Sequence, residues 1–337
     1  MKRLTDPEKP DKISILTDPI HWREWAVREY ILDAVRYVKN YFRPPRFNYG
    51  IYRGHYAVTR SLVEGLKKLD EPFVYNPPSV EALTSTVIVL AGVRTLRQAI
   101  QLKRNGIIAR IFAGPNVVVF SSDAGSIIAS SEVDGVITPS ETVSDLYIKE
   151  NPSLMEKCIV WPAGVDVHYF KPKNKLERRQ ILIYEKQSAG YVGPIQPYAH
   201  YLRARGYPIK IIKYGCYTHE QFLSELQKSC LLVGFVKTES QGIAWAEAWS
   251  TDVPTLIWSN EFGEYRGREY RGCTAPYLDR RNGLFFKDLN EFKEMLALWE
   301  EDPRQFSPRS WVLEHMSDEV CARKLLEKIG AQKSNGL

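Results

Sequence analysis

Short apolar runs of strand length alternate with stretches of helical periodicity along most of the chain, and they do so in two blocks. Strands separated by single helices favour parallel βαβ units, in which helices cover both faces of a sheet. The charged segment 171–179 (KPKNKLERR) lies between the blocks, has no apolar periodicity and is predicted to be a linker. The predicted strands are 12–16, 73–75, 86–90, 107–112, 116–120, 135–138 and 158–161 in the first block, and 181–184, 209–213, 231–236 and 253–258 in the second.

The two blocks predict an α/β fold with two Rossmann-like domains that face each other across a cleft. The length of 337 residues fits this division, since a domain takes roughly 150 residues. We expect a first domain over 1–170, a second over 171–310, and closing helices over 311–330 that pack back on the first domain. Further helices are predicted at 19–42, from the loop 48–54 to about 69, and at 95–105, 140–149, 219–228 and 242–250. A loop leads up to residue 276, and two or three helices close the chain over 289–329. Ligands of open parallel sheets bind beyond the carboxyl ends of the strands, so the cleft is the expected site.

The helix over 19–42 is an insertion after the first predicted strand, opened by Asp18 as N-cap and Pro19 at the first helical position. From residue 19 to residue 60 the chain holds eight basic residues and three acidic ones, and an apolar stripe recurs at helical spacing. Either the stripe packs on the domain with the charges facing water, or the helix forms a lip of the ligand cleft or touches an anionic membrane. Both interpretations remain open at this point.

Composition excludes several classes of protein. Apolar residues make up 44% and charged residues 26% of the chain, which is typical of a globular protein, and no apolar run reaches the roughly 20 residues of a membrane span. The start shows no export signal, so the five scattered cysteines are interpreted as reduced thiols of a cytoplasmic protein, with peripheral membrane contact left open. The net charge is +6, but no cluster of Lys and Arg in the sequence is dense enough to predict nucleic-acid binding.

Motifs of other enzyme classes are missing from the sequence. The cysteines and histidines lack the paired spacings of a zinc site, and no Asp-x-Asp triplet is present. There is no G-x-S-x-G elbow, no Gly-Lys-Ser/Thr phosphate loop and no early G-x-G-x-x-G. These absences argue against a hydrolase, a P-loop enzyme and a nicotinamide dehydrogenase. No bound metal or cofactor is expected.

Two glutamates eight residues apart, Glu239 and Glu247, flank the point where an apolar strand gives way to a helix. Gly242 at the helix start lets a ligand approach the backbone, and the free N–H groups there favour a phosphate. A carboxylate further along the helix can accept two hydrogen bonds from vicinal hydroxyls such as those of a ribose. The alternative is a helix that carries two surface glutamates.

These residues resemble the retaining glycosyltransferases of the GT-B fold, in particular glycosyltransferase family 4. That family has a similar E-x7-E pattern followed by a Val-Pro strand, here Val253-Pro254. The segment 161–172 (WPAGVDVHYFKP) is similar to the one that ends the N-terminal domain of the family, and 282–286 (NGLFF) is similar to its segment before the closing helices. The matches lie in the family's order, over roughly residues 135–325.

The resemblance implies roles for the second domain. Glu247 would hold the ribose of a nucleotide, Glu239 would contact the hydroxyls of the transferred sugar, and Gly242, Ser240 and Gln241 would lie beside the donor. The family also places a basic pair after the first strand of this domain to neutralise the diphosphate, and Lys186 matches one position of the pair. For the second cation Lys213 and Arg203 are candidates, or the site operates with one cation.

The first domain departs further from the family pattern, because the usual Gly-Gly loop after the first strand is replaced by the insertion. Arg53 and Gly54 are candidates for its phosphate-facing role. Asn116, at a strand end, and Ser140, at a helix start, are candidates for the acceptor side of the cleft.

The predicted function is transfer of a sugar from a nucleotide-diphosphate sugar to an acceptor hydroxyl, with retention of configuration and without a metal. Glu239 and Lys186 are the predicted catalytic residues, and the acceptor would be a glycan or a lipid-linked or protein-linked group. The main alternative is a catalytically silent GT-B-like protein that binds a nucleotide or glycan. A phosphorylase or sugar-phosphate enzyme is a third possibility, opposed by the short chain and the lack of a pyridoxal lysine signature.

Overall fold

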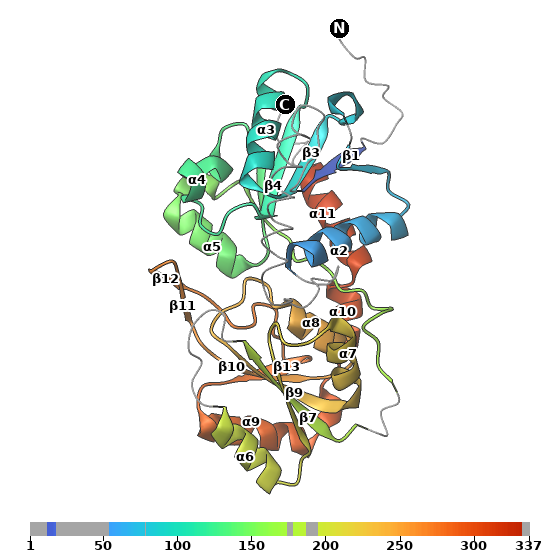
Figure 1. Cartoon of the computed structure of the whole chain (residues 1–337), viewed down its shortest axis with the longest axis vertical. Coiled ribbons are helices and arrows are strands. Elements are labelled where there is room, and N and C mark those ends of the chain that lie inside the picture. Colours follow the sequence, from blue (N-terminus) through green and yellow to red (C-terminus); the bar gives the residue numbers. More distant parts are fainter. Residues whose placement is uncertain (1–11, 18–53, 78, 174–177, 187–194, 332–337) are drawn as a thin grey trace, which may run out of the picture.

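The computed structural model describes residues 12–17, 54–77, 79–173, 178–186 and 195–331. These residues form two parallel sheets, one in each domain, stacked along the long axis of the molecule (Figure 1). The α/β class and the two-domain arrangement predicted from the sequence are therefore confirmed. The predicted helix over 19–42 and Arg53 lie outside the described residues.

The first sheet has six strands in the order β2-β1-β3-β4-β5-β6, and every pair is parallel. Its strands are β1 (Ile13–Leu16), β2 (Phe73–Tyr75), β3 (Thr86–Ala91), β4 (Arg110–Asn116), β5 (Gly135–Thr138) and β6 (Cys158–Val160). The helices of this domain are α2 (Gly54–Lys68), α3 (Val93–Arg104), the short α4 (Asp123–Ser126) and α5 (Glu141–Glu150). Strand β3 is buried along its whole length, as expected for a central parallel strand covered on both faces.

The second sheet has five parallel strands in the order β13-β10-β9-β7-β8. They are β7 (Gln180–Lys186), β8 (Ile209–Lys213), β9 (Ser229–Val236), β10 (Thr255–Trp258) and β13 (Gly283–Phe286). The helices are α6 (Gln196–Ala204), α7 (His219–Lys228), α8 (Ile243–Ser250), α9 (Leu289–Glu301), α10 (Pro308–His315) and α11 (Asp318–Ala331). Helix α6, between β7 and β8, was missed by the sequence analysis.

The last helix returns to the first domain. In Figure 1 α10 lies beside α8 of the second domain, whereas α11 lies beside α2 of the first. The buried carboxylate of Asp318 accepts two hydrogen bonds from Arg60 on α2, at 2.6 and 2.9 Å. The indole of Trp161 donates to the carbonyl of Cys321 at 2.8 Å. The chain thus crosses between the domains twice, and the crossing segments pair through Val165 and Ser317.

Two segments near the cleft differ from the sequence prediction. Residues 116–120 were predicted to be a strand because of their β-branched run, but β4 ends at Asn116 and residues 117–120 continue as a loop. Strand β3 ends at Ala91, opposite Asn116, so it offers no backbone with which the following residues could pair.

The predicted loop before residue 276 contains an antiparallel hairpin, β11 (Phe262–Tyr265) and β12 (Arg268–Arg271). Its two-residue turn, Arg266-Gly267, has positive φ at both positions (53° and 74°), which matches the handedness that tight hairpins require. Figure 1 shows the hairpin extending from the second domain toward the first.

No helix among the described residues combines the length and the apolarity that a membrane crossing requires.

Candidate functional site

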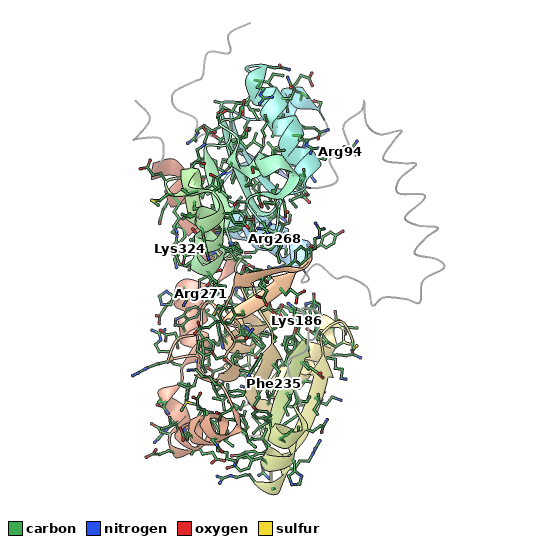
Figure 2. The ribbon with its side chains drawn as sticks, turned by 90° about the vertical axis from the view of Figure 1, so that its left-hand side faces the viewer. Arg94, Lys186, Phe235, Arg268, Arg271 and Lys324 are labelled. Atoms are coloured by element: carbon green, nitrogen blue, oxygen red, sulfur yellow. The ribbon has the colours of Figure 1, made fainter. Side chains whose placement is uncertain are left out.

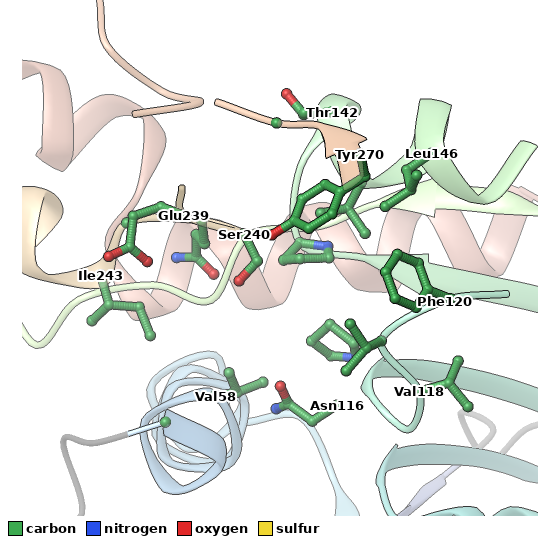
Figure 3. Close-up of a pocket in the computed structure, with 18 of the residues that line it drawn as sticks. Val58, Asn116, Val118, Phe120, Thr142, Leu146, Glu239, Ser240, Ile243 and Tyr270 are labelled. Atoms are coloured by element: carbon green, nitrogen blue, oxygen red, sulfur yellow. The ribbon is translucent and has the colours of Figure 1, made fainter. Parts of the chain in front are cut away.

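A cavity of about 670 Å³ lies between the two domains, at the carboxyl ends of strands from both sheets. Residues of both domains line it, and Figure 3 shows Glu239 and Ser240 of the second domain across from Val58 and Asn116 of the first. This volume falls in the range of small-molecule sites, and the position is the one expected for ligands of open parallel sheets.

The centre of the second-domain wall is an ion pair between Lys186 and Glu239. Lys186 is the last residue of β7, and its Cα partner on the neighbouring β9 is Val236, three residues before Glu239. The adjacent strand ends bring Lys186 Nζ to 2.7 Å from Glu239 Oε1. Lys186 Nζ also lies 4.8 Å from the ring centroid of Tyr214, within cation–π range.

The pair keeps the lysine charged. Burial disfavours the ammonium ion, but the charge of Glu239 and the hydrogen bond to it outweigh burial and raise the pKa of Lys186. A fixed positive charge therefore faces the cavity at the carboxyl end of β7.

Helix α8 begins at the cavity and needs a glycine there. Gly242, its N-cap, has a φ of +84°, and a Cβ at this position would clash with the indole of Trp245. The backbone of Glu239 is held as well, since its N–H donates to the carbonyl of Cys273 at 2.8 Å. The loop 239–242 is thus fixed at both ends, with the positive end of the α8 dipole at the cavity.

Glu247 lies in α8, is 4% exposed and lines the cavity. His219, the first residue of α7, places Nε2 3.8 Å from Glu247 Oε1. Tyr184 and Tyr217 complete this part of the wall, with their hydroxyls 3.3 Å apart. His219, Tyr214 and Tyr217 were not among the residues predicted from the sequence. Their position in the sequence could have indicated them. They follow the predicted strand 209–213, and the carboxyl ends of parallel strands, including the one that carries Lys186, lie at the same end of the sheet.

Gln241 joins the two domains. Its Nε2 donates to the carbonyl of Ala163 at 2.7 Å, and its Oε1 accepts from the N–H of Ala163 at 2.9 Å. Ala163 lies in the segment between the two sheets. Gln241 was expected to contact the donor. The structure uses its side chain amide, which is buried and lines the cavity, to bind the backbone of this segment.

The first-domain wall is built from the starts of α2 and α3, the end of β4, the loop that follows it and α5, and it is mostly apolar. Its apolar side chains are Val58, Val93, Pro115, Val117, Val118, Val119, Phe120, Ala124, Pro139, Val143 and Leu146. Gly54, at the start of α2, belongs to the same wall and has a φ of +51°. Asn116 is its clearest polar group and faces the cavity in Figure 3.

The β11–β12 hairpin spans the two walls. Arg266, Tyr270 and Arg271 line the cavity from the second domain. Arg268 reaches the first domain, where it donates to Ser122 Oγ at 3.1 Å, pairs with Glu150, and places its guanidinium 4.0 Å from the ring centroid of Phe120. Figure 2 shows Arg268 at the junction of the domains.

Three candidates from the sequence do not reach the cavity. Lys213 ends the edge strand β8, is exposed, and lies 3.6 Å from Glu185. Ser140 is the N-cap of α5, and its hydroxyl accepts from the N–H of Val143 at 3.4 Å. Arg203 lies on α6, which packs beside α9 at the end of the molecule farthest from the first domain (Figure 1). Of the described lysines, Lys186 is the one that lines the cavity, together with Arg266 and Arg271 of the hairpin.

Among the residues with assigned positions, no three His, Cys, Asp or Glu side chains lie close enough together to hold a metal ion.

No protein-family model matches the sequence, and no curated protein matches it. Among solved structures, the chain is similar to the lipopolysaccharide outer core galactosyltransferase WaaB in its apo form, with 12% identity and a TM-score of 0.53 over 95% of this chain and 99% of that one. It is also similar to the N-terminal domain of Candida albicans trehalose-6-phosphate phosphatase, with 10% identity and a TM-score of 0.51 over 92% and 81% of the two chains.

The structure of TarM is a more distant match, with 15% identity and a TM-score of 0.45 over 72% of this chain. This chain spans only about half of TarM, since 54% of that protein is covered. At these identities the similarity to WaaB shows the fold alone, and it confirms the GT-B fold predicted from the sequence.

Proposed function

We propose that the chain is a glycosyltransferase that moves a sugar from a nucleotide-diphosphate sugar to an acceptor hydroxyl. The observation that carries the proposal is the placement of Lys186, Glu239 and Glu247 on one wall of the cavity between two GT-B domains. The name of WaaB, a galactosyltransferase with the same fold over nearly its whole length, supports the same reaction class.

Each of the three side chains has a role that matches its surroundings. Departure of the nucleotide diphosphate leaves negative charge on the phosphate oxygens, and Lys186 with the N–H groups at the start of α8 stabilises it. Glu239 holds Lys186 and presents its other oxygen to the hydroxyls of the transferred sugar. Glu247, buried beside His219, accepts hydrogen bonds from the ribose.

The reaction we propose retains the configuration of the sugar, as the resemblance to family 4 implies. The acceptor oxygen forms a bond to the anomeric carbon on the face that the diphosphate leaves, while the bond between that carbon and the phosphate oxygen breaks. The hydroxyl proton passes to the departing phosphate oxygen. The proposal assigns the positive charge to Lys186 and requires no metal ion.

The test is hydrolysis of nucleotide sugars by the purified protein without an acceptor. A panel of UDP, GDP and ADP sugars should contain one from which the enzyme releases the nucleotide diphosphate. Excess chelator should leave this rate unchanged. A rate that falls on chelation and returns with magnesium or manganese would overturn the metal-free part of the proposal and leave the transfer itself standing.

A silent binding protein remains the second candidate because of the ion pair itself. Glu239 neutralises Lys186 in the structure, which leaves less net positive charge for a diphosphate. The similarity to a domain of a phosphatase also shows that the fold occurs outside proteins named as transferases. A protein of this kind would bind a nucleotide sugar and release no diphosphate from any member of the panel.

A further inference from the structure

The first-domain wall of the cavity offers few polar groups to a ligand. Apart from Asn116 and Thr142, its polar side chains are already engaged among the described residues. The hydroxyl of Tyr147 donates to the carbonyl of Val118 at 2.7 Å. The carboxylate of Asp123 accepts from the N–H groups of Val119 and Phe120, at 3.2 and 3.0 Å. A ligand on this side therefore meets branched aliphatic side chains.

Such a wall discriminates between two kinds of acceptor. A sugar carries a hydroxyl on almost every carbon, and each hydroxyl that loses water must find a new hydrogen-bond partner. Along Val118, Val119 and Leu146 there are side chains without donors or acceptors. A hydrocarbon body gains from the same surface, because burial removes apolar area from water.

Asn116 provides the polar group that a single hydroxyl would need. It ends β4 and faces the space between this wall and Glu239 and Ser240 in Figure 3. Its Nδ2 is buried and has no hydrogen-bond partner in the part of the chain that the structure describes. Asn116 as a residue is partly exposed and lines the cavity, so its amide is a polar group of this wall that can meet a ligand hydroxyl.

We propose that the acceptor is a small molecule whose hydroxyl is carried on an apolar body, such as a phenol or an alcohol with a hydrocarbon framework. The inference rests on the proposed function and narrows its acceptor class. The apolar body packs on Val118, Val119 and Leu146, and the hydroxyl lies beside Asn116 and faces the donor. Its oxygen bonds to the anomeric carbon, the bond to the diphosphate oxygen breaks, and the hydroxyl proton moves to that oxygen.

The test compares two probes that differ in apolar surface, 4-butylphenol and methyl α-D-glucoside, by calorimetric titration of the full chain. The phenol should bind at least about tenfold more tightly than the glucoside, which corresponds to about 1.4 kcal/mol. Tighter binding of the glucoside, or no binding of the phenol, would overturn the inference.

A matched pair of variants locates the binding. Val119 lines the cavity and is 44% exposed, whereas Ile107 lies in the same domain, outside the cavity, and is 46% exposed. Both positions accept a carboxylate without burying it. Val119→Asp should weaken phenol binding by about tenfold or more, because the charge would lie against the hydrocarbon, and Ile107→Asp should leave it unchanged. Equal effects of the two variants would contradict the proposed location.

A second variant keeps the test decisive if Val119→Asp alters the loop. Leu146→Ala removes apolar surface from the helix side of the wall and should also weaken phenol binding, by roughly threefold to tenfold. If both wall variants bind the phenol as tightly as the wild type, the inference is wrong.

Nucleotide binding separates this inference from the proposed function. UDP, GDP and ADP are titrated into the same proteins without a phenol. If a nucleotide binds and the phenol does not, the acceptor class is wrong while the proposed function stands. If the phenol binds at the wall and none of the nucleotides binds, the apolar site stands as a ligand site and the transferase proposal fails.

Discussion

The two walls of the cavity differ in polarity. The second-domain wall carries Lys186, Glu239 and Glu247, and each is held by a neighbour from another strand or helix, whereas the first-domain wall is a surface of valines with leucine and proline. A charge that is fixed in advance stabilises charge that develops in a reaction, and an apolar wall selects by shape and by water exclusion. The proposed function gives the two domains separate tasks, leaving-group stabilisation in the second and acceptor selection in the first.

The largest effect is expected when the positive charge is removed from the second-domain wall. Lys186→Met should lower donor hydrolysis by roughly 10²- to 10³-fold, as the loss of one electrostatic contact to a transition state commonly does. Lys213→Met is the matched control, since this lysine ends the neighbouring strand but lies outside the cavity, and it should retain the wild-type rate. Similar rates in the two variants would remove Lys186 from the catalytic role.

A smaller effect should follow from loosening the contact between the domains. Gln241→Ala leaves the buried N–H and carbonyl of Ala163 without their side-chain partner, at about 1–3 kcal/mol. Thermal unfolding should shift down by several degrees, and Ser240→Ala, an exposed neighbour, should unfold like the wild type. An unchanged melting temperature in Gln241→Ala would show that these hydrogen bonds do not hold the walls together.

Loss of the contact between the hairpin and the first domain should change ligand binding in the cavity more than it changes the free energy of unfolding. Arg268 is about half exposed, so its pair with Glu150 should contribute no more than about 1 kcal/mol. Arg268→Ala should raise the KM for the acceptor and leave the KM for the donor near its wild-type value, because the contacts broken lie on the first-domain wall. Arg304→Ala, which breaks a more exposed pair with Asp302, serves as control. A change in the donor KM alone would contradict this assignment.

The ion pair also predicts how nucleotide affinity depends on pH. Since Glu239 raises the pKa of Lys186, the ammonium form persists as pH rises and is lost only above the range of an ordinary lysine, near pH 10. Nucleotide affinity should therefore show no loss attributable to Lys186 between about pH 6 and pH 9. In Glu239→Gln burial acts without the compensating charge, and the alkaline loss of affinity should move to lower pH. If the profiles of the two proteins coincide, Glu239 does not control this charge.

The parts of the site that could be predicted from the sequence are those with short-range signals. The E-x7-E spacing follows an apolar strand, so it placed Glu239 and Glu247 at one sheet edge, and alternation of strands and helices predicted both parallel sheets. Strand order makes Lys186 a neighbour of this loop, which the fold resemblance anticipated. The cavity contains all three residues.

The remaining features depend on contacts between distant residues. Nothing near Gln241 indicates that it binds Ala163, 78 residues earlier in the chain. Lys213 ends a predicted strand, but β8 is the edge strand, and sequence alone does not give strand order. The run 117–119 has strand propensity and forms a cavity wall instead, because the sheet has no partner left for it.

The division of tasks between the walls is tested most directly by one calorimetric series with the nucleotide diphosphate that binds the wild type. Glu247→Gln replaces a carboxylate that would bond the ribose, and it should weaken nucleotide binding by roughly 10- to 150-fold, since a hydrogen bond to a charged group contributes about 1.5–3 kcal/mol. Val119→Asp, on the opposite wall, should bind the nucleotide with wild-type affinity. Loss of affinity in Val119→Asp with full affinity in Glu247→Gln would place the nucleotide on the first-domain wall and contradict the account.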